Sequence, residues 1–379
     1  MSIRSRWSRR SRSRGRRVAL HLAVGAVLAT GLAACGEDET TAKGGEPKVE
    51  APEIDDSLTP MQQAEKYDEL MDGASQSYKV AVLTTCTDLN AWCQAMTRYQ
   101  AEAAEKYDVE LDMYDAAFDP AKQLRQVQDA IAKGGYDGFI FAPVAAAPGC
   151  GMLKQLLDTG LPVQQVNSPV CEEEDFSEGT TGMVSTSSEK YYRNYLEYVF
   201  DSCEGEDCKV AVLGGVSGQD GWRRLQSAIA DTKEKYDNVE IVVEQPANYD
   251  PNQALRITQD AFQRDPDIDV ILSAYDEMSR GVLQALDDAG KTPGTDVRLY
   301  SIGGTPYGLE QVAAGTITAT IQSDPYPEGY FGVVELVRFL ETGVKTEGWS
   351  STSEWSGIVE GPGSDILTQE NVDKYEPTY

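Results

Sequence analysis

The side chains that could carry out chemistry set the first limits on what this protein does. The only histidine, His21, lies in an Arg-rich leader, so the chain that remains after loss of residues 1–34 has none. Histidine-based triads, histidine metal sites and histidine pH switches are thereby excluded. The sequence has no G-x-S-x-G elbow and no Walker-type loop. Paired-carboxylate hydrolysis stays open because 62 acidic residues permit many pairs. No motif favours it, so we expect no enzyme, cofactor or metal site.

Residues 1–35 have the pattern of an export signal. Eight arginines precede an apolar run over residues 18–34, which is short for a bilayer span, and the segment ends in LAAC at residues 32–35. LAAC resembles the lipobox of bacterial lipoproteins, in which the cysteine is acylated and becomes the mature N-terminus. We therefore predict a lipoprotein signal peptide at 1–34 and an extracytoplasmic protein anchored to the cell membrane by a lipid on Cys35. A signal anchor, or an ordinary signal peptide with a chance cysteine, is the alternative.

The segment after the predicted lipid site is expected to be a tether. Residues 36–60 are acidic, rich in Pro and Gly and poor in apolar side chains, so they cannot bury a core. We assign residues 35–75 to a lipidated N-terminus and a disordered acidic tether with a short helix. Residues 35–379 hold 25 basic and 62 acidic residues. This charge repels nucleic acid and anionic membranes, and no nucleic-acid partner is expected.

Six cysteines remain after Cys35, and an even number in an exported chain favours disulfides. Sequence proximity favours three pairs: Cys86–Cys93, Cys150–Cys171 and Cys203–Cys208. Free buried thiols are the alternative. A metal site is less favoured, because no C-x-x-C pair occurs and the acidic run at 172–175 lacks the ligand spacing of a calcium loop.

The sequence repeats itself at an interval of about 130 residues. Four matches occur in the same order: KVAVL at 79–83 and 209–213, Trp92 and Trp222, EKYD at 105–108 and 234–237, and Phe118-Asp119-Pro120 and Tyr249-Asp250-Pro251. One short match would be chance, but four in order indicate an internal duplication.

Each copy alternates strands with helices. The KVAVL runs predict buried parallel strands, and Asp119 and Asp250, each followed by proline, are typical helix N-caps. The helix after Asp119 is expected to bury Leu124, Val127 and Ile131 on one face. This alternation predicts an α/β fold with two doubly wound parallel-sheet lobes. The carboxyl ends of both sheets are the natural ligand site.

Four longer stretches resemble the type I periplasmic binding proteins of the ribose/galactose class, the sugar receptors of ABC importers. They are DPAKQLRQVQDAIAKGGYDGFIFAPV, YDEMSRGVLQALDDAG, IGGTPYGLEQVAAGTITATIQSDP and ILTQENVDKY, within about residues 76–375. The resemblance implies a three-stranded hinge between the lobes with a ligand cleft beside it. Its crossings are expected near 185–187, 322–324 and 351–355. The N-terminal lobe is then 76–186 plus 323–352, and the C-terminal lobe is 187–322 plus 353–379.

The resemblance also implies a function. The two lobes would close on a sugar or sugar-like polar solute and hand it to an ABC permease, and the protein would act as a monomer. A ligand-sensing receptor for a membrane signalling protein is the alternative from another class. The same fold as the effector domain of a transcription regulator is disfavoured by the lipobox and by the lack of a DNA-binding segment.

Ligand positions follow from the resemblance residue by residue. Asn90 and Trp92 stand in the family's arrangement of asparagine, small residue and aromatic, and Tyr249 falls on the aromatic that stacks from the other lobe. An aromatic ring suits the C–H face of a sugar, while an asparagine amide can donate and accept at hydroxyls. The remaining candidates are listed here: Asp88, Gln219, Trp222, Arg223, Tyr275, Asp276 and Gln322.

Some of these positions depart from the family's pattern. Gln219 stands at the family's arginine position, with Arg223 nearby, and Tyr275 replaces the asparagine before Asp276. The resemblance therefore implies the scaffold without implying ribose or galactose as the ligand. Lobe-core packing is the alternative for Trp92 and is equally open for Trp222, whereas Asp276 could instead cap the following helix.

Overall fold

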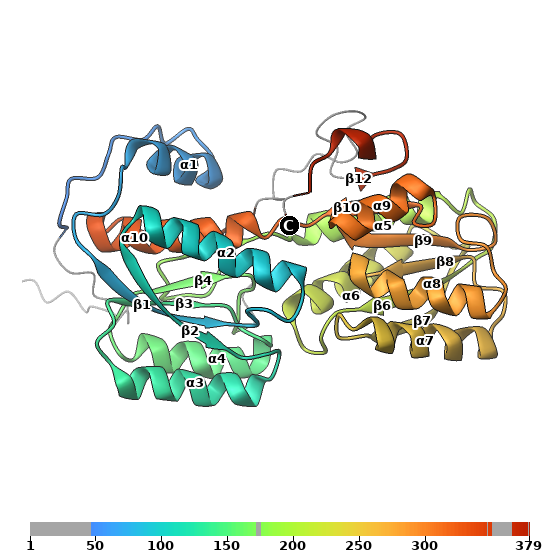
Figure 1. The fold of residues 1–379 in the computed structure, drawn as a ribbon, viewed down its shortest axis with the longest axis horizontal. Helices are drawn as coiled ribbons and strands as arrows, with labels where there is room; N and C mark the ends of the chain where they lie inside the picture. Colours follow the sequence, from blue (N-terminus) through green and yellow to red (C-terminus); the bar gives the residue numbers. More distant parts are fainter. Residues whose placement is uncertain (1–46, 172–175, 347, 351–365, 378) are drawn as a thin grey trace, which may run out of the picture. The chain divides into compact units, whose positions relative to one another are not determined.

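The described residues of the computed structural model form two six-stranded sheets with helices on both faces (Figure 1). The ranges described are 47–171, 176–346, 348–350, 366–377 and 379. The first sheet has the strand order β11-β5-β4-β3-β1-β2 and the second β12-β10-β9-β8-β6-β7. Every pair is parallel except β10 with β12. This confirms the predicted pair of parallel-sheet α/β lobes.

The N-terminal lobe is built on the first sheet. Its elements are β1 (Tyr78–Thr84), α2 (Ala91–Lys106), β2 (Val109–Asp115), α3 (Pro120–Lys133), β3 (Gly138–Phe141), α4 (Ala146–Leu157), β4 (Val163–Val166), β5 (Gly182–Ser185), η2 (Pro327–Phe331), α10 (Gly332–Thr342) and β11 (Trp349–Ser350). Helices α2 and α10 cover one face of the sheet, and α3 and α4 cover the other (Figure 1). The strands are therefore buried on both sides.

The C-terminal lobe repeats this plan on the second sheet. Its elements are α5 (Glu189–Asp201), β6 (Cys208–Gly214), α6 (Asp220–Lys233), β7 (Val239–Pro246), α7 (Pro251–Arg264), β8 (Val270–Ser273), η1 (Asp276–Met278), α8 (Ser279–Asp288), β9 (Arg298–Gly303), α9 (Pro306–Ala314), β10 (Ala319–Gln322), β12 (Ile366–Leu367) and η3 (Val372–Lys374). The order β7-β6-β8-β9-β10 reproduces the order β2-β1-β3-β4-β5. The internal duplication seen in the sequence is thus a duplication of topology.

The two predicted N-caps are present, and the buried face of α3 follows the prediction except at Leu124. Asp119 accepts hydrogen bonds from two backbone N–H groups of the first turn, and Asp250 accepts one from Asn252. Leu124 is 37% exposed. Gln123 faces the sheet in its place, where its amide donates to the Ala142 carbonyl and accepts from the Val144 N–H. Val127 is buried and Ile131 packs against the same cluster, so two of the three predicted positions lie on the buried face.

Two chain crossings between the lobes run side by side. The first follows β5 and the second follows β10, and the Thr186 hydroxyl donates to the Asp324 carbonyl at 2.9 Å. The Tyr191 hydroxyl donates to the Gln322 carbonyl at 2.8 Å. The third expected crossing, at 351–355, lies outside the described residues.

Residues 47–71 lie against the N-terminal lobe, although the sequence places most of them in a disordered tether. The N–H groups of Lys48 and Val49 both donate to the Glu341 carbonyl on α10. Helix α1 (Pro60–Leu70) begins with a capping box and buries Tyr67 beneath the Arg338 guanidinium. These apolar and hydrogen-bonded contacts, spread thinly through a polar stretch, are what composition alone misses.

The six cysteines form the three disulfides that sequence proximity favours: Cys86–Cys93, Cys150–Cys171 and Cys203–Cys208. The acidic run 172–175 and the predicted lipid site Cys35 lie outside the described residues. Across the described part of the chain, no helix is both long and apolar enough to cross a membrane.

Candidate functional site

A cavity of about 100 Å³ is lined by residues of both lobes and of the two described crossings. Its lining residues follow the carboxyl ends of strands in both sheets: Asn90 after β1, Phe118 after β2, Asn167 after β4, Thr186 after β5, Gln219 after β6, Tyr249 after β7, Tyr275 after β8 and Ser323 after β10. This is where a doubly wound sheet places its ligand. The duplication therefore brings two equivalent sheet edges to one cavity.

Half of the predicted site residues line this cavity and half do not. Those that line it are Asn90, Trp92, Gln219, Tyr249 and Tyr275. Those that the structure places elsewhere are Asp88, Trp222, Arg223, Asp276 and Gln322.

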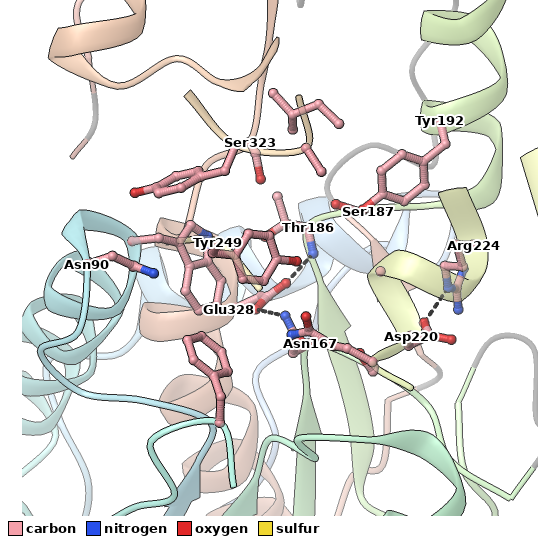
Figure 2. A pocket seen from close by; sticks show the side chains of 18 of the residues that line it. Asn90, Asn167, Thr186, Ser187, Tyr192, Asp220, Arg224, Tyr249, Ser323 and Glu328 are labelled. Carbon is pink, nitrogen blue, oxygen red and sulfur yellow. Dashed lines mark hydrogen bonds and ion pairs between the residues drawn. The ribbon is translucent and has the colours of Figure 1, made fainter. Parts of the chain in front are cut away.

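The loop after β1 presents Asn90 and Trp92. The side-chain oxygen of Asn90 accepts a hydrogen bond from the Cys93 N–H at 3.0 Å and caps α2, which leaves the amide nitrogen for the cavity (Figure 2). Trp92, two residues on, packs against the apolar clusters of both lobes. The Cys86–Cys93 disulfide closes this loop. Both side chains are therefore held by the short segment that carries them.

An aromatic group forms the centre of the cavity wall. The Tyr249 ring lies 5.9 Å from Phe118 of the other lobe and 6.0 Å, edge to face, from Tyr275. A side chain at Gly215 would meet the Tyr249 ring, since an added Cβ would lie 2.3 Å from its hydroxyl. Burial raises the pKa of the Tyr249 phenol, which stays a neutral hydrogen-bonding group. These rings can thus stack on the apolar face of a ligand, and the phenol can form hydrogen bonds with the ligand's hydroxyls.

Trp222 is a core residue of its lobe. It is 5% exposed and packs with Tyr191 and Tyr192 of α5. Gly214 gives it room, because an added Cβ there would lie 2.1 Å from the indole ring. The sequence equivalent, Trp92, is only partly buried. The two tryptophans share a position in the repeat but differ in their role.

Asp276 stabilises its lobe from inside. It is fully buried, and its carboxylate accepts hydrogen bonds from the Thr305 N–H, the Thr305 hydroxyl and the Thr320 hydroxyl. Burial raises its pKa, while these donors oppose the rise. Its hydrogen bonds join three segments of the lobe, and the carboxylate does not line the cavity.

The other displaced candidates lie beside the cavity. The Asp88 side chain is exposed, and Arg223, 56% exposed, pairs with Asp220 at 2.6 Å. Gln322 ends β10, and its neighbour Ser323 lines the cavity. Each of these three residues lies within two positions of one that lines the cavity.

Sequence reasoning missed the charged groups of the cavity. Asp220 starts α6, and its nearly buried carboxylate pairs with Arg223 and Arg224. Figure 2 shows the pair with Arg224. Glu328, on η2, accepts hydrogen bonds from the Asn167 amide at 3.0 Å and the Thr186 N–H at 2.7 Å. Burial raises the pKa of Glu328 to about 7. An available signal was Asp220, an acid at a helix start two residues after the glycine-rich segment 214–218.

The described residues contain no group of three or more His, Cys, Asp or Glu side chains that could hold a metal ion. The ionisable groups of the cavity are instead arranged as one ion-pair cluster, around Asp220, and one separate acid, Glu328. With aromatic rings and amides beside them, these groups suit the reversible binding of a polar molecule.

Comparison with known proteins places this architecture in a family. Over 274 residues the chain is 24% identical to the D-allose-binding periplasmic protein of Escherichia coli (strain K12), covering 71% of this chain and 86% of that protein. It is 29% identical to the ribose import binding protein RbsB of the same organism, covering 61% and 74%. Among solved structures, a galactofuranose binding protein matches with a TM-score of 0.70 at 19% identity, covering 78% of this chain and 96% of that one.

A Caulobacter myo-inositol binding protein matches with a TM-score of 0.67 at 22% identity, covering 80% of this chain and 97% of that one. At these identities the structural matches establish the fold. The family described as "Periplasmic binding protein domain" matches residues 80–343, well over half of the chain. The two duplicated lobes and the cavity at their sheet edges are the architecture of that family, and the chain belongs to the periplasmic binding proteins.

Proposed function

We propose that this protein is the extracytoplasmic substrate-binding lipoprotein of an ABC importer and that it binds a sugar or sugar-like polar molecule in the cavity. The observation that carries the proposal is the lining of the cavity: the rings of Phe118, Trp92 and Tyr249 lie beside the amides of Asn90 and Asn167. Rings stack on the C–H faces of a sugar, and amides exchange hydrogen bonds with its hydroxyls. The names of the relatives, which refer to D-allose and ribose, support the same ligand class.

Ligand binding would proceed by closure of the two lobes. Each lobe supplies part of the wall, so neither half alone encloses a ligand. The backbone N–H of Ala146 in the N-terminal lobe donates to the Gly218 carbonyl of the C-terminal lobe at 3.2 Å. Such a contact at the rim would form on closure and break on opening. The crossings at Thr186 and Asp324 would act as the hinge.

Anchoring through Cys35 rests on the LAAC motif and the acidic segment behind it. Cys35→Ala should release the protein from the membrane fraction or block its processing. Continued partition of the variant with membranes through its N-terminus would contradict the anchor.

A thermal-shift screen followed by titration calorimetry tests the binding function. The panel should contain D-allose, D-ribose, L-arabinose, D-galactose, myo-inositol, glycerol and a nucleoside. We expect at least one sugar or cyclitol to raise the melting temperature and to bind with one-to-one stoichiometry. If no sugar, polyol or cyclitol binds while another class of molecule does, the proposed ligand class is wrong.

A further inference from the structure

Glu328 is a buried acid in the cavity wall that forms no ion pair with any described residue. It is 1% exposed, and both of its oxygens accept hydrogen bonds from neutral donors, Asn167 and Thr186. Figure 2 shows its side chain between these two residues and below Tyr249. Asp220, the other acid of the cavity, differs because two arginines pair with it. Among the described lining residues, Glu328 is therefore the acid with no ion-pair partner.

The groups that face Glu328 do not supply the missing charge. Asp324, on the same crossing, is another acid and further raises the pKa of Glu328. Tyr192 of α5 and Tyr249 are phenols whose own pKa values are raised by burial first and by charges including that of Glu328. An ionised Glu328 in the closed cavity is consequently unfavourable unless a bound molecule brings a positive charge.

A second buried acceptor in the wall lacks a partner. The amide oxygen of Gln219 is buried and makes no hydrogen bond with the described residues. Gln219 itself is 6% exposed and precedes α6 without capping it. Because an unmade hydrogen bond on a buried acceptor costs free energy, the cavity requires a ligand that donates hydrogen bonds. Gln219 and Glu328 thus both line the cavity as acceptors, and the Gln219 oxygen has no donor among the described residues.

We propose that the natural ligand is a sugar or cyclitol bearing a protonated amine, with the ammonium group on Glu328 and a hydroxyl donating to Gln219. An ammonium group offers three donors and the charge that Glu328 lacks. A neutral polyol offers donors but brings no positive charge to pair with the Glu328 carboxylate. This inference rests on the proposed binding function and narrows its ligand class to amino sugars and aminocyclitols.

Matched probe pairs test the inference. Titration calorimetry at neutral pH should compare D-glucosamine with D-glucose, D-galactosamine with D-galactose, and scyllo-inosamine with scyllo-inositol. In the wild-type protein the amine should bind at least about tenfold more tightly than its neutral partner in at least one pair. The coupling energies of close charge pairs at an interface correspond to affinity ratios of about this size or larger.

Glu328→Gln removes the charge and keeps the size of the side chain. It should abolish the preference for the amine, so that both members of the pair bind within about twofold of each other. Glu335→Gln is the matched control, because Glu335 is a buried acid of the same lobe, on α10, and does not line the cavity. That variant should keep the amine preference of the wild type.

The outcomes separate this inference from the proposed function. If the neutral sugar or cyclitol binds as tightly as its amine in every pair, the ammonium partner is wrong and the sugar-binding function stands. If the amine is preferred but Glu328→Gln keeps the preference, the role assigned to Glu328 is wrong. If Glu328→Gln fails to fold, the wild-type comparison decides alone. If no probe and no sugar of the wider panel binds, both proposals fail.

Discussion

Phe118 and Tyr249 occupy equivalent positions of the two repeats, and their rings meet across the cavity with centroids 5.9 Å apart and an interplanar angle of 45°. Each precedes the Asp-Pro pair that starts the second helix of its repeat. Each also has a left-handed backbone, with φ values of 57° and 55°. The duplication thus provides both rings, and the cavity wall is close to symmetric at this point.

The two repeat-equivalent tryptophans should separate binding from stability. Trp92→Ala should weaken binding of the identified ligand at least about tenfold, because it removes stacking and buried area at the cavity. Trp222→Ala should leave affinity nearly unchanged and lower the free energy of unfolding by about 3–5 kcal/mol, the cost of deleting a core tryptophan. Calorimetry and urea unfolding measure the two effects. A large stability loss with unchanged affinity in Trp92→Ala would show that this ring is core as well.

The disulfide around Asn90 and Trp92 should matter for binding beyond its effect on stability. Cys86→Ser with Cys93→Ser frees the loop that presents both side chains, so affinity should fall several-fold. Cys203→Ser with Cys208→Ser is the control, since that disulfide joins the end of α5 to the start of β6. Chain entropy assigns each disulfide about 2 kcal/mol. Equal affinities for the two double variants would contradict a positioning role.

Glu328 should make stability fall with rising pH. Burial raises the pKa of Glu328 to about 7 in the folded protein, whereas a glutamic acid in the unfolded chain has its ordinary pKa of 4.5. Between these two pKa values the folded state binds more protons than the unfolded state. The contribution of Glu328 to stability is therefore fully present below the unfolded pKa of 4.5, and it is lost as pH rises through the folded pKa of about 7. The loss is on the order of 3 kcal/mol.

Urea unfolding of wild type and Glu328→Gln across this pH range checks the effect. As pH falls, the free energy of unfolding of the wild type should rise relative to that of Glu328→Gln. Other buried acids with raised pKa values, such as Glu335 and Asp276, are common to both proteins and cancel in the difference. Parallel profiles would show that Glu328 does not titrate there.

The adjacent glycines after β6 should respond differently to an added methyl group. In Gly215→Ala the new Cβ meets the Tyr249 ring, so the ring should shift and ligand affinity should fall. In Gly214→Ala it meets the core ring of Trp222, so stability should fall and affinity should be affected less. Melting temperatures with and without ligand distinguish the two results. Identical behaviour of both variants would contradict this division.

The fold could be predicted from the sequence because the same strand and helix patterns occur in both copies of the repeat. KVAVL, the Asp-Pro caps and their spacing recur in each copy, and each pattern depends on local geometry. The residues that line the cavity could be predicted only in part. Phe118 could have been found, since it aligns with Tyr249 in the duplication.

Glu328, by contrast, reaches the cavity only through tertiary packing. It lies more than 140 residues along the chain from both of its partners, Thr186 and Asn167, and no local pattern marks it. Trp222 shows that a position shared by the two repeats does not fix the burial of a side chain. A repeat conserves position along the chain, but a neighbouring glycine decides which face a large ring occupies.

The docking of residues 47–71 on α10 makes the two lobes mechanically unequal. Pro47, the first of the described residues, lies beside Gly343 at the end of α10, within the N-terminal lobe. Under the proposed anchor at Cys35, a restraint that reaches residue 47 along the chain would therefore act on that lobe. With the proposed anchor, the N-terminal lobe would be held in place, and opening and closing would move the C-terminal lobe.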